Sequence, residues 1–117
     1  MGVSNFDKQA ATKRLETRYM LHNAKGVEKL LENQHRIYST ALERGDMASI
    51  DLLTDLEAAI DAAGLTDIQK RIIELRFNQD RAMTDAAKIM GVDISTASRN
   101  RKGALKKIAE VFKNWDY

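Results

Sequence analysis

The 117-residue sequence contains no cysteine and no proline, and it has only six glycines and few aromatic residues. Without cysteine there is no disulfide framework, no thiolate metal ligand and no cysteine nucleophile. Without proline and with little glycine, the strongest helix breakers are nearly absent. The remaining composition is dominated by alanine, leucine and charged residues. These absences predict an all-α fold.

Long apolar runs are also missing. No stretch approaches the roughly 18 apolar residues that a bilayer-spanning helix needs. The first ten residues lack the basic segment and apolar run of a signal peptide. Hydrophobic residues make up 44% of the chain, which is normal for a globular protein. We therefore expect a soluble, cytoplasmic protein with no membrane partner.

Signals for catalysis and metal binding are weak. The two histidines, His22 and His35, have no convincing ligand spacing, and no cysteine stands near them. Glu57 and Asp61 form an i, i+4 acidic pair, as many exposed helices do. There is no glycine-rich phosphate loop and no nucleophile motif. We expect no enzyme activity, no metal site and no cofactor.

The net charge of +2 hides an uneven distribution. Residues 1–64 hold 8 Lys and Arg against 10 Asp and Glu, whereas residues 65–117 hold 11 against 7. Five basic residues and no acidic one fall between Arg99 and Lys107. The C-terminal half is therefore the candidate binder of a polyanion.

Helical spacing of apolar residues recurs through the N-terminal half, over residues 6–23, 27–44 and 47–63. Gly26 marks a break or kink, Gly45 is placed to take the left-handed conformation of a helix end, and Asp46 is placed to cap the next helix. The apolar residues of the first two segments serve either as a core packed on the C-terminal half or as a homodimer surface. They are Leu15, Tyr19, Val27, Leu30, Leu31, Ile37, Tyr38 and Leu42.

The C-terminal half has clear helix boundaries. Gly64 ends the third helix, and Thr66 with Gln69 forms a capping box for a fourth, whose expected buried residues are Ile68, Ile72, Ile73, Leu75 and Phe77. Residues 78–81 are predicted to be a loop. Thr84 is predicted to cap a short helix over residues 85–90. We expect one region at 1–64, for packing or oligomerisation, and a second at 65–117.

The stretch from Met83 to Lys102 has the pattern of a helix-turn-helix. Ala87 is small enough for a close helix crossing, Gly91 makes the turn, and Asp93 caps the helix that starts at Ile94. That helix is expected to run to about Asn114, about 30 Å at ~1.5 Å per residue. Its expected apolar stripe is Ala97, Ala104, Leu105, Ile108, Val111 or Phe112, and Trp115. The opposite face then carries Ser95, Ser98, Arg99 and Lys102, which suits entry into a DNA major groove.

A family resemblance rests on several short motifs in the C-terminal half. They are the opening Leu65-Thr66-Asp67-x-Gln69-Lys70, the segment Leu75-Arg76-Phe77, Ala87, Gly91, Ser95-Thr96-x-Ser98-Arg99 and Ala104-Leu105-Lys106-Lys107. These roughly 45 C-terminal residues resemble region 4 of bacterial sigma-70 factors. They also resemble the small sigma-like transcription regulators of phages and prophages. The resemblance implies a helix-turn-helix that binds double-stranded DNA in the cytoplasm of a bacterial host. RNA polymerase is a second partner to consider, and residues 1–64 carry no such resemblance.

The expected DNA-binding residues combine the resemblance with helix geometry. The resemblance implies that Ile94, Ser95, Ser98 and Arg99 face the major groove, and Arg99 suits guanine. Phosphate contacts are expected from Thr84 and from the basic residues that follow Arg99. The complete set is Thr84, Ile94, Ser95, Thr96, Ser98, Arg99, Arg101, Lys102, Lys106 and Lys107. Ile94, Asn100 and Gly103 depart from the family pattern.

The sequence thus predicts a sequence-specific, DNA-binding transcription regulator, either an activator or a repressor. No segment for melting DNA is recognisable. Two other functions fit the same pattern of helices. One is the DNA-recognition subunit of a phage packaging machine, similar to a small terminase, which also joins a helix-turn-helix to helical oligomerisation segments. The other is an adaptor that binds RNA polymerase or a host regulator without binding DNA.

Overall fold

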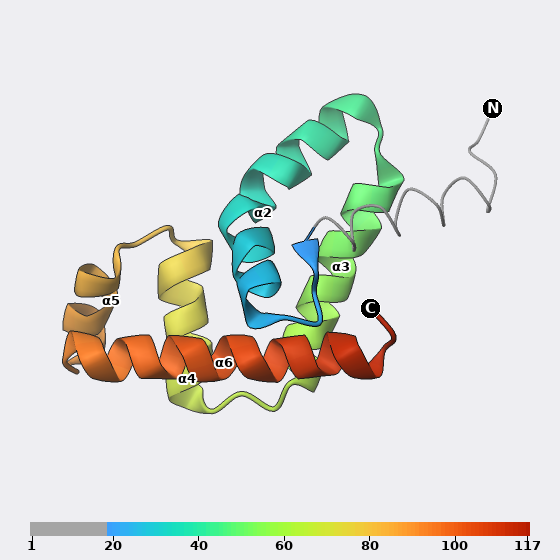
Figure 1. Ribbon diagram of the computed structural model, residues 1–117. Coiled ribbons are helices and arrows are strands. Elements are labelled where there is room, and N and C mark those ends of the chain that lie inside the picture. Colours follow the sequence, from blue (N-terminus) through green and yellow to red (C-terminus); the bar gives the residue numbers. More distant parts are fainter. Residues whose placement is uncertain (1–18) are drawn as a thin grey trace.

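A computed structural model describes residues 19–117 of the protein. Within this range there are five α-helices, one π-helix and no strand, so the predicted all-α fold is confirmed. In chain order the elements are α2 (Ala24–Arg44), α3 (Met47–Ala62), α4 (Asp67–Ile73), the π-helix η1 (Glu74–Asn78), α5 (Met83–Met90) and α6 (Ile94–Asn114). Figure 1 shows α6 as a long rod with α5 at one end and α3 at the other.

The entry into α2 differs from the sequence prediction. Residues 20–23 form a turn, so a helix does not continue to Asn23, and the rest of the helix predicted over 6–23 lies outside the described residues. Asn23 is the N-cap and accepts a hydrogen bond from the Lys25 amide at 2.8 Å. Gly26 lies inside α2 and causes no break. A Cβ there would lie only 1.7 Å from the Tyr19 carbonyl oxygen, so this glycine permits a close backbone approach.

The turn between α2 and α3 follows the sequence prediction. Gly45 has a φ of 66° and accordingly adopts the left-handed conformation. The Asp46 carboxylate then caps α3, accepting hydrogen bonds from the Ser49 amide at 3.2 Å and from the Ser49 hydroxyl at 2.8 Å. The α3 helix ends at Ala62, one residue before the predicted limit and two before Gly64.

The capping box at the start of α4 is confirmed. The Thr66 amide donates to Gln69 Oε1 at 3.0 Å, and the Gln69 amide donates to Thr66 Oγ1 at 3.2 Å. The prediction that Ile68 is buried was wrong, because its side chain is 48% exposed. Gln69 occupies the contact with α6 instead, and it is only 8% exposed.

The end of the α4 segment contains a π-helix that the sequence pattern did not reveal. Its wider turn is closed by the Gln79 amide, which donates to the Glu74 carbonyl at 3.0 Å. Asn78 is therefore the last residue of η1 and not the first residue of a loop. Leu75 and Phe77 are buried, as predicted.

The start of α5 also corrects a prediction. The helix begins at Met83, and Ala82 occupies the N-cap position without a side-chain hydrogen bond. Thr84 is thus an exposed residue of the first turn and not a cap. At the other end Gly91 has a φ of 69°. The Val92 amide donates to the Ala87 carbonyl and the Gly91 amide to the Lys88 carbonyl, which is a Schellman ending.

One hydrophobic core joins both halves of the described chain. The α6 helix contacts α2, α3, α4 and α5. Its buried residues, Ala97, Ala104, Leu105, Ile108, Ala109 and Phe112, share one cluster with Val27, Leu30 and Leu31 of α2 and Leu52 and Leu56 of α3. Val27, Leu30 and Leu31 are therefore core residues. Tyr38 and Leu42, predicted for the same role, are 50% and 56% exposed.

The chain end folds back onto this core. Phe112 is fully buried, and Tyr117 packs against it with ring centroids 4.9 Å apart. The Tyr117 hydroxyl donates to the carboxylate of Asp55 in α3. Trp115, predicted to belong to the apolar stripe, is instead 42% exposed. Different elements therefore hold the two ends of α6. The division of the chain into one region at residues 1–64 and a second at 65–117 remains a prediction.

None of the helices in residues 19–117 has the length and apolar character to span a membrane.

Candidate nucleic-acid interface

The α5–turn–α6 unit is held by backbone and capping contacts at its turn. The buried side chains of Ala86 and Ala87 lie where α5 packs on α6. Asp93 caps α6, accepting a hydrogen bond from the Thr96 amide at 2.7 Å. The backbone and side chain of Thr96 lower the pKa of Asp93, with a smaller contribution from the positive charge of Arg99. This arrangement fixes the direction in which the first turns of α6 leave the turn.

A strip of exposed polar and basic residues runs along the outer face of α6. Ser95, Arg99, Lys102 and Lys106 are all exposed, and their spacing of four, three and four places them on one side of a helix. The strip from Ser95 to Lys106 is about 17 Å long at ~1.5 Å per residue. A major groove is about 12 Å wide. The strip is long enough to reach both base edges and a phosphate backbone.

The other predicted residues at this end of the molecule divide by exposure. Ile94 is 48% exposed, so its side chain is accessible to an apolar partner such as a thymine methyl group. Thr96 and Ser98 are half-buried at the flanks of the strip, and Thr84 is exposed on the neighbouring α5. The structure brings these four residues to the same end of the molecule as Ser95 and Arg99.

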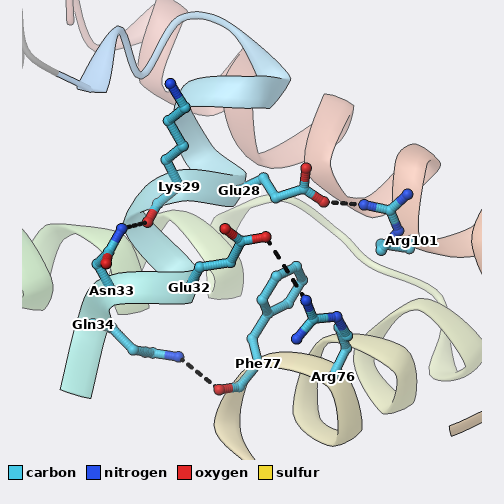
Figure 2. A network of polar contacts seen from close by, with 8 residues as sticks. All are labelled: Glu28, Lys29, Glu32, Asn33, Gln34, Arg76, Phe77 and Arg101. Atoms are coloured by element: carbon cyan, nitrogen blue, oxygen red, sulfur yellow. Dashed lines mark hydrogen bonds and ion pairs between the residues drawn. The ribbon is translucent and has the colours of Figure 1, made fainter. Parts of the chain in front are cut away.

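Arg101 lies on a different side of α6. Its guanidinium donates to the carboxylate of Glu28 in α2, and the two side chains are only 20% and 25% exposed. Figure 2 shows this pair between α2 and α6, with Arg101 pointing toward α2. Arg101 is therefore already paired within the protein.

Lys107 is also engaged within the protein. Its ammonium group donates to Gln69 Oε1 at 2.8 Å, the same oxygen that accepts from the Thr66 amide. Gly103 makes this contact possible, because a Cβ at Gly103 would lie 3.0 Å from Gln69 Nε2. The missing side chain at Gly103 thus permits close packing of α4 on α6.

Asn100 is half-buried, and its side chain is used locally. Its amide Nδ2 donates to the Thr96 carbonyl one turn earlier at 2.9 Å. The Asn100 side chain therefore makes its hydrogen bond within the protein.

Charge is separated along the length of α6. The α3 helix carries four acidic residues and no basic one, whereas α6 carries six basic residues and one acidic residue. Figure 1 places α3 at the C-terminal end of α6 and α5 at its N-terminal end. Because acidic side chains repel phosphate, the N-terminal turns of α6 are the favourable end for a polyanion.

Two features of this region were missed in the sequence. Lys113 is exposed and lies seven residues beyond Lys106, so it continues the same row toward the C-terminal end of α6, with the exposed Glu110 between the two lysines. The spacing alone was enough to find it. The second feature is the anchoring of α2 on η1, which has no local signal. Glu32 pairs with Arg76 at 3.8 Å, and Gln34 Nε2 donates to the Phe77 carbonyl at 3.3 Å (Figure 2).

Among residues 19–117 there is no group of three or more His, Asp or Glu side chains placed to hold a metal ion.

A comparison with protein families gives one match. Residues 63–110 match the family described as Sigma-70, region 4. This stretch covers α4, η1, α5 and most of α6, so the C-terminal part of the chain is similar to a sigma-70 region 4 helix-turn-helix domain. Domains of this family bind DNA and RNA polymerase and are regulatory rather than enzymatic. Comparisons with curated proteins and with solved structures gave no match.

Proposed function

We propose that the protein is a sequence-specific DNA-binding regulator of transcription, encoded by a phage or prophage and acting in the cytoplasm of a bacterial cell. The observation that carries the proposal is the exposed strip on α6, within a stretch that matches a DNA-binding family. RNA polymerase is the protein partner that the family suggests. A pair of protein copies, joined through the N-terminal helices, is part of the same proposal.

In this proposal the first three turns of α6 enter the major groove. Arg99 forks onto the O6 and N7 atoms of a guanine, and Ser95 and Ile94 contact neighbouring base edges. Lys102 and Lys106 contact phosphates on the rim of the groove, with Thr84 on the adjacent α5. Arg101 and Lys107 are left out of the proposed interface because Glu28 and Gln69 already bind them.

The test begins with selection of bound sequences from random duplex DNA by the full-length protein. We expect Arg99→Ala to lower affinity for the selected duplex by about 1–3 kcal/mol and to remove the preference at one base pair. Affinity for unrelated duplexes should fall much less. Lys29→Ala is a suitable control, because Lys29 is an exposed basic residue of α2, outside the elements of the proposed interface.

Salt dependence provides the second readout. Each phosphate contact releases counterions, so log K should fall linearly with log salt, by roughly 0.9 per contact. A selected sequence that binds with no salt dependence, or an Arg99→Ala protein that reads the sequence as well as the unmodified protein, would refute the assignment of α6.

A further inference from the structure

The distal half of α2 carries an exposed strip that the described chain leaves largely open. Within it, His35 Nε2 lies 3.2 Å from the Asn78 carbonyl oxygen of η1, with which it forms a hydrogen bond. His35, Tyr38, Ser39 and Leu42 are all exposed, with Tyr38 at 50% and Leu42 at 56%. Nearer the start of α2, the apolar residues are instead buried in the common core. Figure 1 shows the later turns of α2 running away from α6 together with the start of α3. This half of the helix is therefore accessible to a second molecule.

The spacing of the four residues makes the strip complementary to itself. Positions 35, 38, 39 and 42 follow the i, i+3, i+4, i+7 pattern of a helix–helix contact. They are also symmetric about the midpoint between Tyr38 and Ser39. In an antiparallel pair of α2 helices, each Leu42 therefore packs against His35 of the second copy. Each Tyr38 lies against the small Ser39, which leaves room for its ring.

Charges beside the strip fit the same pairing. Arg36 and Glu43 are exposed and lie seven residues apart, so they stand on the same edge of the strip. In the antiparallel register, Arg36 of one copy lies within one turn of Glu43 of the other. A two-fold axis generates this pair twice. In a parallel two-fold pair the charged edges of the two copies lie on opposite sides of the contact, so this pair does not form.

From this geometry we infer that residues 35–43 of α2 form the surface on which a second copy of the protein docks, as an antiparallel and two-fold symmetric helix pair. The contact is short, so it belongs to the class of small interfaces that form weak or transient complexes. We expect an equilibrium between monomer and dimer that DNA binding shifts toward the dimer, because both copies then act on one duplex.

The pairing also sets the separation of the two recognition helices, a consequence that rests on the proposed function. The pair Glu28–Arg101 marks the place where α2 meets α6. Glu28 lies about 10.5 residues from the centre of the helix pair, so the two Glu28 positions are about 32 Å apart at ~1.5 Å per residue. Half-sites one turn apart on B-DNA have a separation of about 34–36 Å. We expect the bound sequence to be an inverted repeat with centres about 10 base pairs apart.

The first experiment is sedimentation equilibrium of the full-length protein without DNA, at concentrations up to about 1 mM. We expect a reversible dimer. Leu42→Glu places two buried charges at the contact and should raise the dissociation constant more than about tenfold. Ile68→Glu makes the same change at an apolar residue of similar exposure on α4 and should leave the dimer intact. A protein that stays monomeric throughout, or a Leu42→Glu protein that dimerises normally, overturns the proposal.

The second experiment tests the register by charge exchange. Arg36→Glu and Glu43→Arg should each weaken the dimer, because each places like charges opposite one another. The double variant should restore it to within about threefold of the unmodified protein. Failure of the double variant to recover would exclude the antiparallel register. Circular dichroism of each variant confirms that α2 remains folded.

These outcomes separate the dimer surface from DNA binding. A protein that dimerises through α2 but selects no DNA sequence contradicts the proposed function and supports the surface. A protein that selects a DNA sequence but stays monomeric, both free and on the selected duplex, supports DNA binding and contradicts the surface. A third outcome is that the unmodified protein is always monomeric and that Leu42→Glu no longer binds RNA polymerase. The strip would then be a polymerase-binding surface, and the proposal would be overturned.

Discussion

At the scale of single residues, what a basic side chain on α6 can contribute to phosphate binding depends more on its partner within the protein than on whether it is Lys or Arg. Six Lys and Arg residues lie on this helix, and composition alone makes them equivalent. The structure separates them, because Arg101 and Lys107 have acceptors within the protein while Lys102 and Lys106 face outward. A side chain that must first leave an internal acceptor gains less from a phosphate.

Lys106 and Lys107 give a direct comparison of these two situations. We expect Lys106→Gln to weaken binding to all duplexes and to reduce the salt slope by roughly 0.9. Lys107→Gln should change the salt slope less and should lower the free energy of unfolding by about 1 kcal/mol, because Gln69 loses a hydrogen bond. Fluorescence titrations at several salt concentrations and urea unfolding measure the two effects. Equal salt slopes for the two variants would contradict the assignment.

Asp93 gives a prediction about pH. Its pKa is lower in the folded protein, mainly through hydrogen bonds from Thr96, so folding favours the charged carboxylate. The stabilisation is therefore complete above the ordinary pKa of 3.8 and is lost as the pH falls through the lower folded value. We expect the protection of the amides in the first turn of α6, measured against the intrinsic exchange rate at each pH, to fall on acidification below that point.

The variant Asp93→Asn separates this effect from the titration of other carboxylates. Asparagine caps a helix about as well as aspartate but does not titrate. The protection of the amides in the first turn of α6 should depend less on pH in Asp93→Asn than in the unmodified protein. Identical pH profiles for the two proteins would show that the Asp93 carboxylate has no such role.

At the scale of elements, the sequence was informative where the signal is local. The capping box at Thr66, the left-handed Gly45 and the full length of α6 were all predictable, because each depends on residues within one or two turns. The incorrect predictions concern contacts between elements. Thr84 has the side chain of a cap, yet α5 starts two residues earlier than predicted, with Ala82 at its N-cap.

Ile68 illustrates why burial was harder to predict than helix position. An isoleucine in the helical pattern of α4 was expected inside, but the contact with α6 is made by Gln69. The buried amide of Gln69 is acceptable because Thr66 and Lys107 satisfy its oxygen. Lys107 is 38 residues away in the chain. No local pattern can report such a contact, and the same holds for the pairing of Arg101 with Glu28.

The crossing of α4 and α6 leads to a prediction for Gly103. Replacing glycine by alanine in a helix normally stabilises it by about 1 kcal/mol. Here the added Cβ would lie 3.0 Å from Gln69 Nε2, and two hydrogen bonds hold the Gln69 side chain in place. We expect Gly103→Ala to lower the free energy of unfolding by about 1 kcal/mol in urea denaturation.

The control is the same change in a Gln69→Ala background. With the Gln69 side chain removed, the new methyl group has space, and Gly103→Ala should then stabilise the protein. A change of sign between the two backgrounds measures the coupling between these residues. Stabilisation by Gly103→Ala in both backgrounds would show that Gln69 moves aside at little cost.

At the scale of the whole molecule, the described helices share one core, so the N-terminal part supports the recognition helix. Glu28 and Glu32, one turn apart on α2, pair with Arg101 of α6 and Arg76 of η1 (Figure 2). One helix thereby fixes two elements of the DNA-binding domain relative to each other. We expect the two parts of the chain to unfold in one cooperative transition.

The two glutamates differ in burial, which allows a matched test. We expect Glu28→Ala to lower the free energy of unfolding by about 1–3 kcal/mol, since it leaves the largely buried Arg101 unpaired. Glu32→Ala should cost less than about 1 kcal/mol, because its pair is longer and more exposed. Urea unfolding followed by circular dichroism and by Trp115 fluorescence provides the measurement. Different midpoints for the two signals would contradict the single transition.

The shared helix α6 also limits how this domain can be transplanted. The stretch that matches the family ends at residue 110, before Phe112 and Tyr117 close the core against α3. A fragment cut to the family boundaries would expose the faces of α6 and η1 that α2 covers. In the proposed function, a chimera that borrows the DNA specificity must therefore carry α2 and α3 with α6, and exchanging a few side chains of the exposed strip is the less disruptive route to a new target.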